Sequence, residues 1–321
     1  MEDTISVVLY ILLSAILIKF LWFKSRASHK NLPPSPPCIP FLGHLHLLKP
    51  PTHRAFLHLS NKYGPIISLK FGSRLVVTVS SPSAVEECFT KNDIVLADRP
   101  KLLMGKHLGY NYTNMVASPY GDHWRNLRRI GAIEIFSTTR LNMFVNVRKD
   151  EIRLLLKKLS RNSLGDFAQV ELKSALSDLT FNNIVRMLAG KRYYGEDVAD
   201  EAEAVQFREL IAEVFEYSGA TNPSDFLPIL NWINGKYVNK VKKLAKTMDG
   251  LLQRMVDDNR SKQQGNTVID HLLSLQKSQP DYYTDQIIKG LILVRVDFSD
   301  LFAMIFLCVT SYSLLRTYNK F

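Results

Sequence analysis

Residues 119–129 read Pro-Tyr-Gly-Asp-His-Trp-Arg-Asn-Leu-Arg-Arg, a turn followed by the start of a helix. The proline and glycine are turn residues, and Asp122 is expected to cap the first N–H groups of the helix. Trp124 and Arg128 are four residues apart, so they share one helix face. An aromatic ring beside a guanidinium suits a planar anion, because arginine offers paired donors that match a carboxylate. The alternative is a basic helix with solvated arginines and a packed tryptophan.

The bulk composition is that of a globular protein. The chain has 321 residues, of which 46% are hydrophobic and 22% charged, so it can bury a substantial core. Its formal net charge of +11 favours an acidic partner, an anionic membrane surface or nucleic acid. We expect no nucleic-acid partner, because there is no zinc-ligand spacing and no compact basic tract with interleaved aromatic residues. Three cysteines give no disulfide framework and fit a reducing compartment.

An apolar run extends from Ile5 to Phe23 and is interrupted only by two serines and Lys19. As a helix it is long enough to cross a bilayer. Acidic residues precede the run and basic residues follow it, which places the N-terminus in the lumen and the rest of the chain in the cytosol. We therefore predict a single-pass transmembrane anchor over residues 1–24. A cleaved signal peptide is the alternative, but in such peptides the basic residues come before the apolar run.

Residues 25–50 are basic and rich in proline, with five prolines among residues 31–40. Such a density excludes helix interior and favours a stiff, extended segment. It is either a plain spacer or a hinge that sets the angle of a catalytic domain against the membrane.

The remaining pattern predicts a mainly α protein with one small β-hairpin. The hairpin pairs residues 66–71 with residues 74–79 across a two-residue turn. Residues 91–118 are expected to be a loop with one short helix at 101–107. The expected helices cover residues 52–63, 82–90, a run from Trp124 that includes 154–159 and 176–188, then 235–260, and a last helix capped by Thr284. Five lysines in the first half of 235–260 form either a solvated face or a contact with a membrane surface.

Several of these stretches, in this order, resemble the microsomal cytochrome P450 monooxygenases of plants over about residues 1–294. The sequences that carry the resemblance are Leu32–Pro37 with Pro40–Gly43, Ala97–Pro100, Tyr120–Arg129, Phe181–Gly195 and Ser224–Pro228. The last two, together with Ile130–Phe136, are similar to the subfamily that includes isoflavone 2′- and 3′-hydroxylases.

The resemblance implies a heme cofactor, with Arg128 pairing with a propionate and Trp124 hydrogen-bonding it or packing beside the porphyrin edge. It also implies electrons from NADPH-cytochrome P450 reductase and a location in the endoplasmic reticulum membrane. The family's substrate-contact loop falls at about residues 104–117. Within it, the side chains suited to an apolar or phenolic substrate are those of Met104, Tyr112, Met115 and Val116. An ordinary surface loop is the alternative for each of them.

The resemblance divides the chain into the anchor, the hinge, the N-terminal part of a cytochrome P450 domain at 51–294, and an apolar tail at 295–321 that resembles no part of the family. The family's thiolate loop, Phe-x-x-Gly-x-Arg-x-Cys-x-Gly, surrounds none of the three cysteines, Cys38, Cys88 and Cys308. The Glu-x-x-Arg motif and the oxygen-activating Thr segment are missing too. We therefore expect no catalytic residue, no metal ligand and no monooxygenase activity from these residues. The alternative role is that of a non-catalytic, membrane-anchored remnant or interaction protein, and an unspliced intron or alternative exon end would explain the tail.

Overall fold

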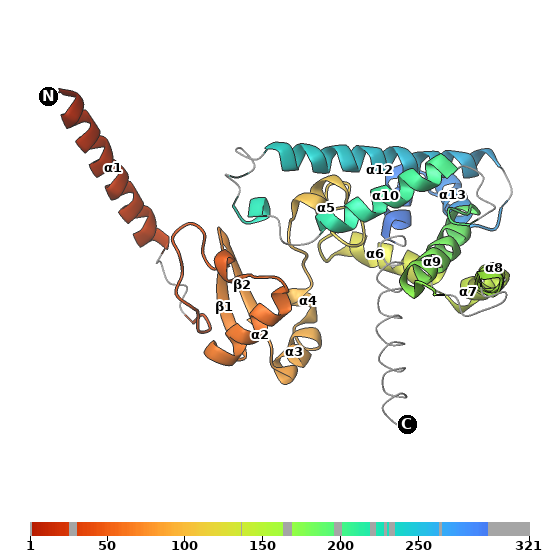
Figure 1. Ribbon diagram of the computed structural model, residues 1–321, viewed down its shortest axis with the longest axis horizontal. Helices are drawn as coiled ribbons and strands as arrows, with labels where there is room; N and C mark the ends of the chain where they lie inside the picture. Colours follow the sequence, from red (N-terminus) through yellow and green to blue (C-terminus); the bar gives the residue numbers. More distant parts are fainter. Residues whose placement is uncertain are drawn as a thin grey trace. The chain divides into compact units, whose positions relative to one another are not determined.

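A computed structural model describes residues 2–25, 31–135, 137–162, 169–195, 201–218, 223–227, 230, 235–262 and 265–294 (Figure 1). The chain divides into two compact units. The hairpin unit comprises residues 1–96 with 223–233, and the helical unit comprises residues 97–222 with 234–321. The expected tail at 295–321 and Cys308 lie outside the described residues.

Helix α1, Glu2–Ser25, confirms that the N-terminal apolar run is helical. Its large apolar side chains between Val7 and Ile18 are 52–74% exposed, so they pack against little else in the chain. Across the side chains that the structure describes, no helix is both long and apolar enough to cross a membrane. The anchor over residues 1–24 stays a prediction.

The hairpin unit is built on two antiparallel strands, β1 (Ile66–Phe71) and β2 (Arg74–Val79), which pair in the expected register. Gly72 in the turn has φ +57°, and a Cβ there would lie 2.3 Å from the Phe226 carbonyl oxygen, so glycine is required. Helix α2 (Thr52–Tyr63) packs on β1. The small core on this face contains Leu59, Ile67, Leu69, Phe71 and Phe226. The short helices η1 (Leu45–Leu47), α3 (Pro82–Phe89), α4 (Asp93–Leu96) and η3 (Pro223–Asp225) complete the unit.

Part of the proline-rich segment is fixed to β1. The Ser68 amide donates to the Pro34 carbonyl at 2.9 Å. Further along, the Lys70 amide donates to His44 Nδ1 at 2.7 Å, so the imidazole proton resides on Nε2, which donates to the Pro36 carbonyl at 2.9 Å. These backbone contacts occupy the outer edge of β1, and a hinge role for residues 25–50 stays a prediction.

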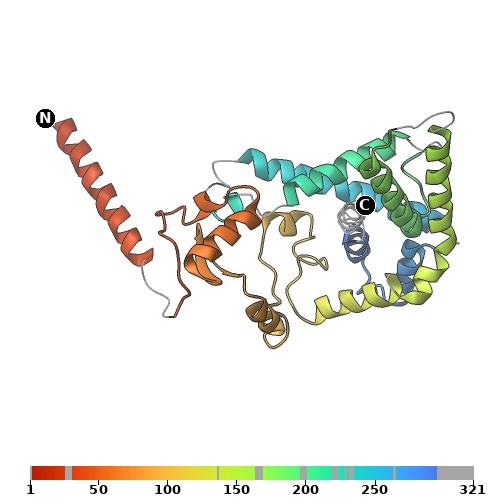
Figure 2. The same cartoon turned by 60° about the horizontal axis from the view of Figure 1, so that its bottom comes forward.

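The helical unit is organised around the long helix α12, Gly235–Ser261. Its apolar residues recur every three or four positions, and Val241, Leu244, Met248, Leu251 and Met255 are all at most 2% exposed. Helices α5, α9, α10 and α13 all contact α12, and Figure 2 shows α10 running alongside it. The other elements of this unit are α5 (Leu103–His107), α6 (Asp122–Ile130), the π-helical turn η2 (Gly131–Ile135), α7 (Thr138–Met143), α8 (Val145–Asn162), α9 (Leu172–Ala189), α10 (Glu201–Ser218), α13 (Val268–Ser278) and a helix at 285–294.

Most of the expected elements are confirmed, including the hairpin, α2 and the cap of the last helix, where Thr284 Oγ1 accepts from the Ile287 amide at 3.4 Å. The sequence interpretation missed α4 and α13. Helix α13 carries a recognisable signal, because Thr267 and Asp270 form a capping box directly before an apolar run. Four of the five lysines in the first half of α12 are exposed, and Lys240 pairs with Glu213 at 2.7 Å.

A buried carboxylate ties α8 to α9 and to the segment that follows α9. Glu151 is 3% exposed and accepts hydrogen bonds from Arg186 Nη1 at 2.7 Å, Arg192 Nη2 at 3.3 Å and Asn182 Nδ2 at 3.2 Å. The Asn182 amide group also binds the backbone of Tyr193 and Tyr194. Because the Arg186 and Arg192 side chains are only 22% and 17% exposed, they depend on this carboxylate for compensation.

We predict that Glu151→Gln lowers the free energy of unfolding by about 3 kcal/mol, because it removes the charge of the buried carboxylate that two partly buried guanidiniums contact. The matched control is Glu213→Gln, which breaks the Lys240 pair whose side chains are each 42% exposed, and it should lower the free energy of unfolding much less. Urea unfolding followed by circular dichroism measures both. Equal losses in the two variants would show that Glu151 is an ordinary surface charge.

Candidate functional site

Helix α6 presents Trp124 and Arg128 away from its buried face. Leu127 and Ile130 are 1% and 3% exposed, and they fix this helix against the core of the helical unit. The expectation that Asp122 caps α6 is wrong: Gly121 is the N-cap, and Asp122 is the first helical residue. There its carboxylate forms an ion pair with the Arg125 guanidinium, near the positive end of the helix dipole.

The predicted pairing of Trp124 with Arg128 is confirmed. The Arg128 guanidinium carbon lies 5.1 Å from the centroid of the Trp124 ring, a cation–π distance. The Tyr120 ring packs against the Trp124 ring, with 5.5 Å between the two ring centroids, and this contact further fixes Trp124. The stacked guanidinium keeps its N–H edge available, because stacking uses only the face of the group.

Arg128 differs from its two neighbours in how its charge is compensated. Arg125 is paired with Asp122, and Arg129 donates to Asn126 Oδ1 at 2.6 Å. Arg128 is exposed, and within the described part of the chain it has neither an ion pair nor a side-chain hydrogen bond. Of these three arginines, Arg128 is therefore the best placed to receive an anion.

The loop before α6 is hydrogen-bonded to two half-buried rings of the helix, His123 and Trp124. Trp124 Nε1 donates to the Met115 carbonyl at 3.1 Å. His123 Nε2 lies 2.8 Å from the Thr113 carbonyl, which can only accept, so this nitrogen carries the proton. The position of residues 113–115 is thus coupled to that of α6.

The four predicted substrate-contact side chains take different environments. Met104 and Met115 pack against the core of the helical unit. Tyr112 is half-buried, and its ring would lie 2.9 Å from a Cβ on Gly105, whereas Val116 is 49% exposed. All four keep some exposed surface: Met104, Tyr112 and Met115 are half-buried, and Val116 is exposed.

The same loop contains three consecutive residues in the left-handed region. Tyr110, Asn111 and Tyr112 have φ values of +51°, +56° and +64°. None is glycine, and for the two tyrosines this conformation costs about 1–2 kcal/mol each relative to right-handed backbone, whereas asparagine adopts it more readily. Two backbone hydrogen bonds close this turn onto α5, from Asn111 to the Lys106 carbonyl and from Tyr112 to the Gly105 carbonyl.

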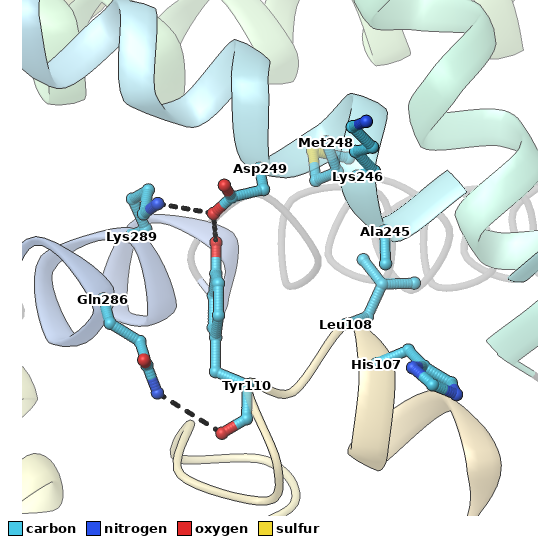
Figure 3. A pocket seen from close by; sticks show the side chains of 9 residues that line it. All are labelled: His107, Leu108, Tyr110, Ala245, Lys246, Met248, Asp249, Gln286 and Lys289. Carbon is cyan, nitrogen blue, oxygen red and sulfur yellow. Dashed lines mark hydrogen bonds and ion pairs between the residues drawn. The ribbon is translucent and has the colours of Figure 1, made fainter. Parts of the chain in front are cut away.

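A cavity of about 370 Å³ lies beside this turn, and Figure 3 shows the Tyr110 side chain pointing from the loop to α12. Tyr110 Oη donates to Asp249 Oδ1 at 2.9 Å, and the Lys289 ammonium pairs with the same oxygen. Burial and the adjacent carboxylate of Asp249 raise the pKa of the Tyr110 phenol, so it stays a donor. Sequence reasoning missed this cluster, although a lysine within the apolar run 287–294 is an unusual feature that indicates a buried partner.

The sequence pattern of the family described as cytochrome P450 matches residues 33–294 of the chain. The chain belongs to the cytochrome P450 family. Three of its relatives are cytochrome P450 81Q32 of Catharanthus roseus, isoflavone 2′-hydroxylase of Glycyrrhiza echinata and isoflavone 3′-hydroxylase of Medicago truncatula. They are 55%, 52% and 50% identical over 293, 271 and 286 residues, which cover 90%, 83% and 86% of this chain. The chain spans 58%, 54% and 57% of their respective lengths.

The cytochrome P450 family uses heme, and the chemistry of Arg128 is compatible with one of its propionate groups. A propionate is a carboxylate, and the guanidinium of Arg128 offers it a forked donor held in place by the Trp124 ring. The indole N–H of Trp124 is already donated to Met115, so stacking is its main contribution here. The described cysteines do not match the residue that supplies the iron's thiolate ligand in this family. Exposed Cys38 and half-buried Cys88 both lack the family's thiolate-loop sequence.

We predict that Trp124→Phe keeps the stacked ring but lowers the free energy of unfolding by about 1 kcal/mol, because the Met115 carbonyl loses its donor. The comparison is Arg125→Gln, which removes an exposed pair with Asp122 and should leave the stability nearly unchanged. Urea midpoints of the two variants measure the difference. If Trp124→Phe is as stable as the parent chain, the indole hydrogen bond does not hold the loop.

Proposed function

We propose that this cytochrome P450 chain forms the propionate-binding and substrate-facing part of a heme-thiolate monooxygenase, which inserts one atom of O2 into an apolar or phenolic plant metabolite. One observation carries the proposal: the exposed Arg128 guanidinium is stacked on Trp124 and has no carboxylate partner among the described residues. The isoflavone hydroxylases among the relatives support a flat phenolic substrate.

In this proposal Arg128 provides the charge and Trp124 fixes its direction. A carboxylate that pairs edge-on with the guanidinium forms two parallel N–H···O bonds, which orient as well as bind. Leu127 and Ile130 hold α6 rigid from the buried side, so the arginine needs little reordering when the anion arrives. When bound, heme supplies the redox chemistry that activates O2.

The loop 104–117 contacts the substrate in this proposal. Val116, Tyr112 and Met115 supply an exposed aliphatic group, a flat ring and a polarisable thioether, which together suit an aromatic ligand. The overall charge of +11 favours docking of an acidic electron donor such as NADPH-cytochrome P450 reductase.

The axial thiolate does not come from a recognisable position in these 321 residues, because none of the three cysteines has the family's surrounding sequence. On its own, the chain is therefore proposed to bind heme through the propionate end without supplying the sulfur ligand. The second candidate function, a non-catalytic membrane-anchored interaction protein, rests on the same observation.

A hemin titration of the purified chain tests the propionate role. Arg128→Gln should weaken binding roughly tenfold, because a charge-assisted pair is lost. The matched control, Arg129→Gln, removes an equal charge one residue away and should leave the affinity unchanged. After reduction and addition of CO, we expect no thiolate-type Soret shift. Equal binding in the two variants would refute the role of Arg128, and a thiolate-type shift would refute the missing sulfur ligand.

We also propose that α1 anchors the chain in the endoplasmic reticulum membrane as a single pass, with its N-terminus in the lumen and the main domain in the cytosol. The support is the apolar run from Ile5 to Phe23, whose side chains from Val7 to Ile18 include no charged group and are largely exposed. Acidic residues precede this run and basic residues follow it.

Extraction of microsomes with alkaline carbonate tests the anchor. The parent chain should stay in the pellet. A variant with Leu12→Lys and Ile16→Lys should appear in the supernatant, because each charge at the centre of a membrane helix costs about 3 kcal/mol. The control replaces the same two residues with Phe and Leu and should stay in the pellet. A parent chain that is itself extracted would overturn the proposal.

A further inference from the structure

The left-handed turn at Tyr110–Tyr112 is held from outside by groups of two distant helices. Asp249 of α12 accepts from the Tyr110 phenol at 2.9 Å. Gln286, on the helix at 285–294, donates from Nε2 to Thr113 Oγ1 at 3.0 Å and lies 3.4 Å from the Tyr110 carbonyl oxygen. Figure 3 shows both ends of Tyr110 bonded to these helices, the phenol to Asp249 and the carbonyl to Gln286.

Asp249 is itself fixed by a buried cation. The Lys289 side chain is only 10% exposed, whereas that of Asp249 is 44% exposed. A buried ammonium needs a counter-charge, so the carboxylate of Asp249 is held toward Lys289 and cannot turn freely into solvent. The Lys289 ammonium also lies 5.6 Å from the centroid of the Tyr110 ring, which adds a cation–π contact to the same phenol.

A turn of three non-glycine residues in the left-handed region does not persist by its own preference. The contacts within the loop, such as Thr113 Oγ1 to the Tyr110 carbonyl at 2.7 Å, would move with the loop if it opened. The contacts to Asp249 and Gln286 are different, because they join the loop to helices packed in the core.

We propose that Asp249 is a positioning residue that, oriented by Lys289, holds the left-handed turn at Tyr110–Tyr112 and thereby sets the position of the loop 104–117. This rests on the proposed function in one respect, the contact of that loop with a substrate. The loop's other end is bonded to α6 through Thr113 and Met115, so the loop is fixed by Asp249 at the turn and by α6 after it.

The helical unit contains a second cluster of the same chemistry, which provides a control. Tyr193 Oη donates to Glu203 Oε1 at 3.0 Å, and Lys191 Nζ lies 3.6 Å from Glu203 Oε2. Burial and the Glu203 carboxylate raise the pKa of the Tyr193 phenol, as Asp249 does for Tyr110. Tyr193 has ordinary backbone geometry and lies outside the loop, so it reports the loss of such a hydrogen bond without the strained turn.

Amide hydrogen exchange of the full chain, read on peptides that cover residues 108–118, tests the proposal. Tyr110→Phe should raise exchange in this segment roughly fivefold or more, the effect of losing one buried hydrogen bond. Tyr193→Phe should leave the segment unchanged. Asp249→Ala should raise exchange in this segment more than Tyr110→Phe does. Asp257→Ala removes an exposed carboxylate from the same helix and should leave exchange in the loop unchanged. Unchanged exchange in Tyr110→Phe, or an equal rise in Tyr193→Phe, overturns the proposal even if Asp249→Ala fails to fold.

A second readout separates this proposal from the proposed function. Binding of an unsubstituted isoflavone to the same variants is followed by quenching of intrinsic fluorescence. If exchange rises in Tyr110→Phe and isoflavone affinity falls with it, both proposals are supported. If exchange rises while the affinity is the same as in the parent chain, Asp249 positions the loop, and the assignment of the loop to substrate contact is wrong.

Discussion

The helical unit depends on the apolar stripe of α12. Residues such as Met248, Leu251 and Met255 are almost fully buried, and four other helices pack against this one element. Burying that stripe is the large favourable term, at about 25 cal/mol per Å² of apolar surface. The packing of this stripe also fixes the positions of the polar residues beside it. Asp249 follows the buried Met248, and for that reason it lies where it can bind Tyr110 of the loop and Lys289.

In helix α6, too, buried apolar residues fix the helix and thereby position the residues outside the core. Leu127 and Ile130 pack it against the core, while Trp124 is half-buried and Arg128 is exposed. The pairing of ring and guanidinium follows from helical spacing, whereas helical spacing does not reveal that no described carboxylate pairs with Arg128.

Local signals in the sequence were sufficient for the elements that form from neighbouring residues. The hairpin follows from a β-branched run and a two-residue turn, and the face shared by Trp124 and Arg128 follows from helical periodicity. In the cluster of Tyr110, Asp249 and Lys289, Tyr110 is 139 positions from Asp249 in the sequence, and Asp249 is 40 positions from Lys289. No local sequence pattern predicts that residues so far apart are in contact. The sequence did not reveal that Gly121 and not Asp122 is the N-cap, because an acidic residue stabilises a helix both at the cap position and in the first turn.

The indole of Trp124 has a single N–H, and the Met115 carbonyl receives it. An anion at Arg128 that also recruits this donor must take it from the loop. Occupancy of the anion site and the conformation of residues 113–115 then become linked equilibria, and linkage is reciprocal. If α6 binds an anion in this way, a ligand that favours one conformation of the loop alters the affinity for that anion to the same degree.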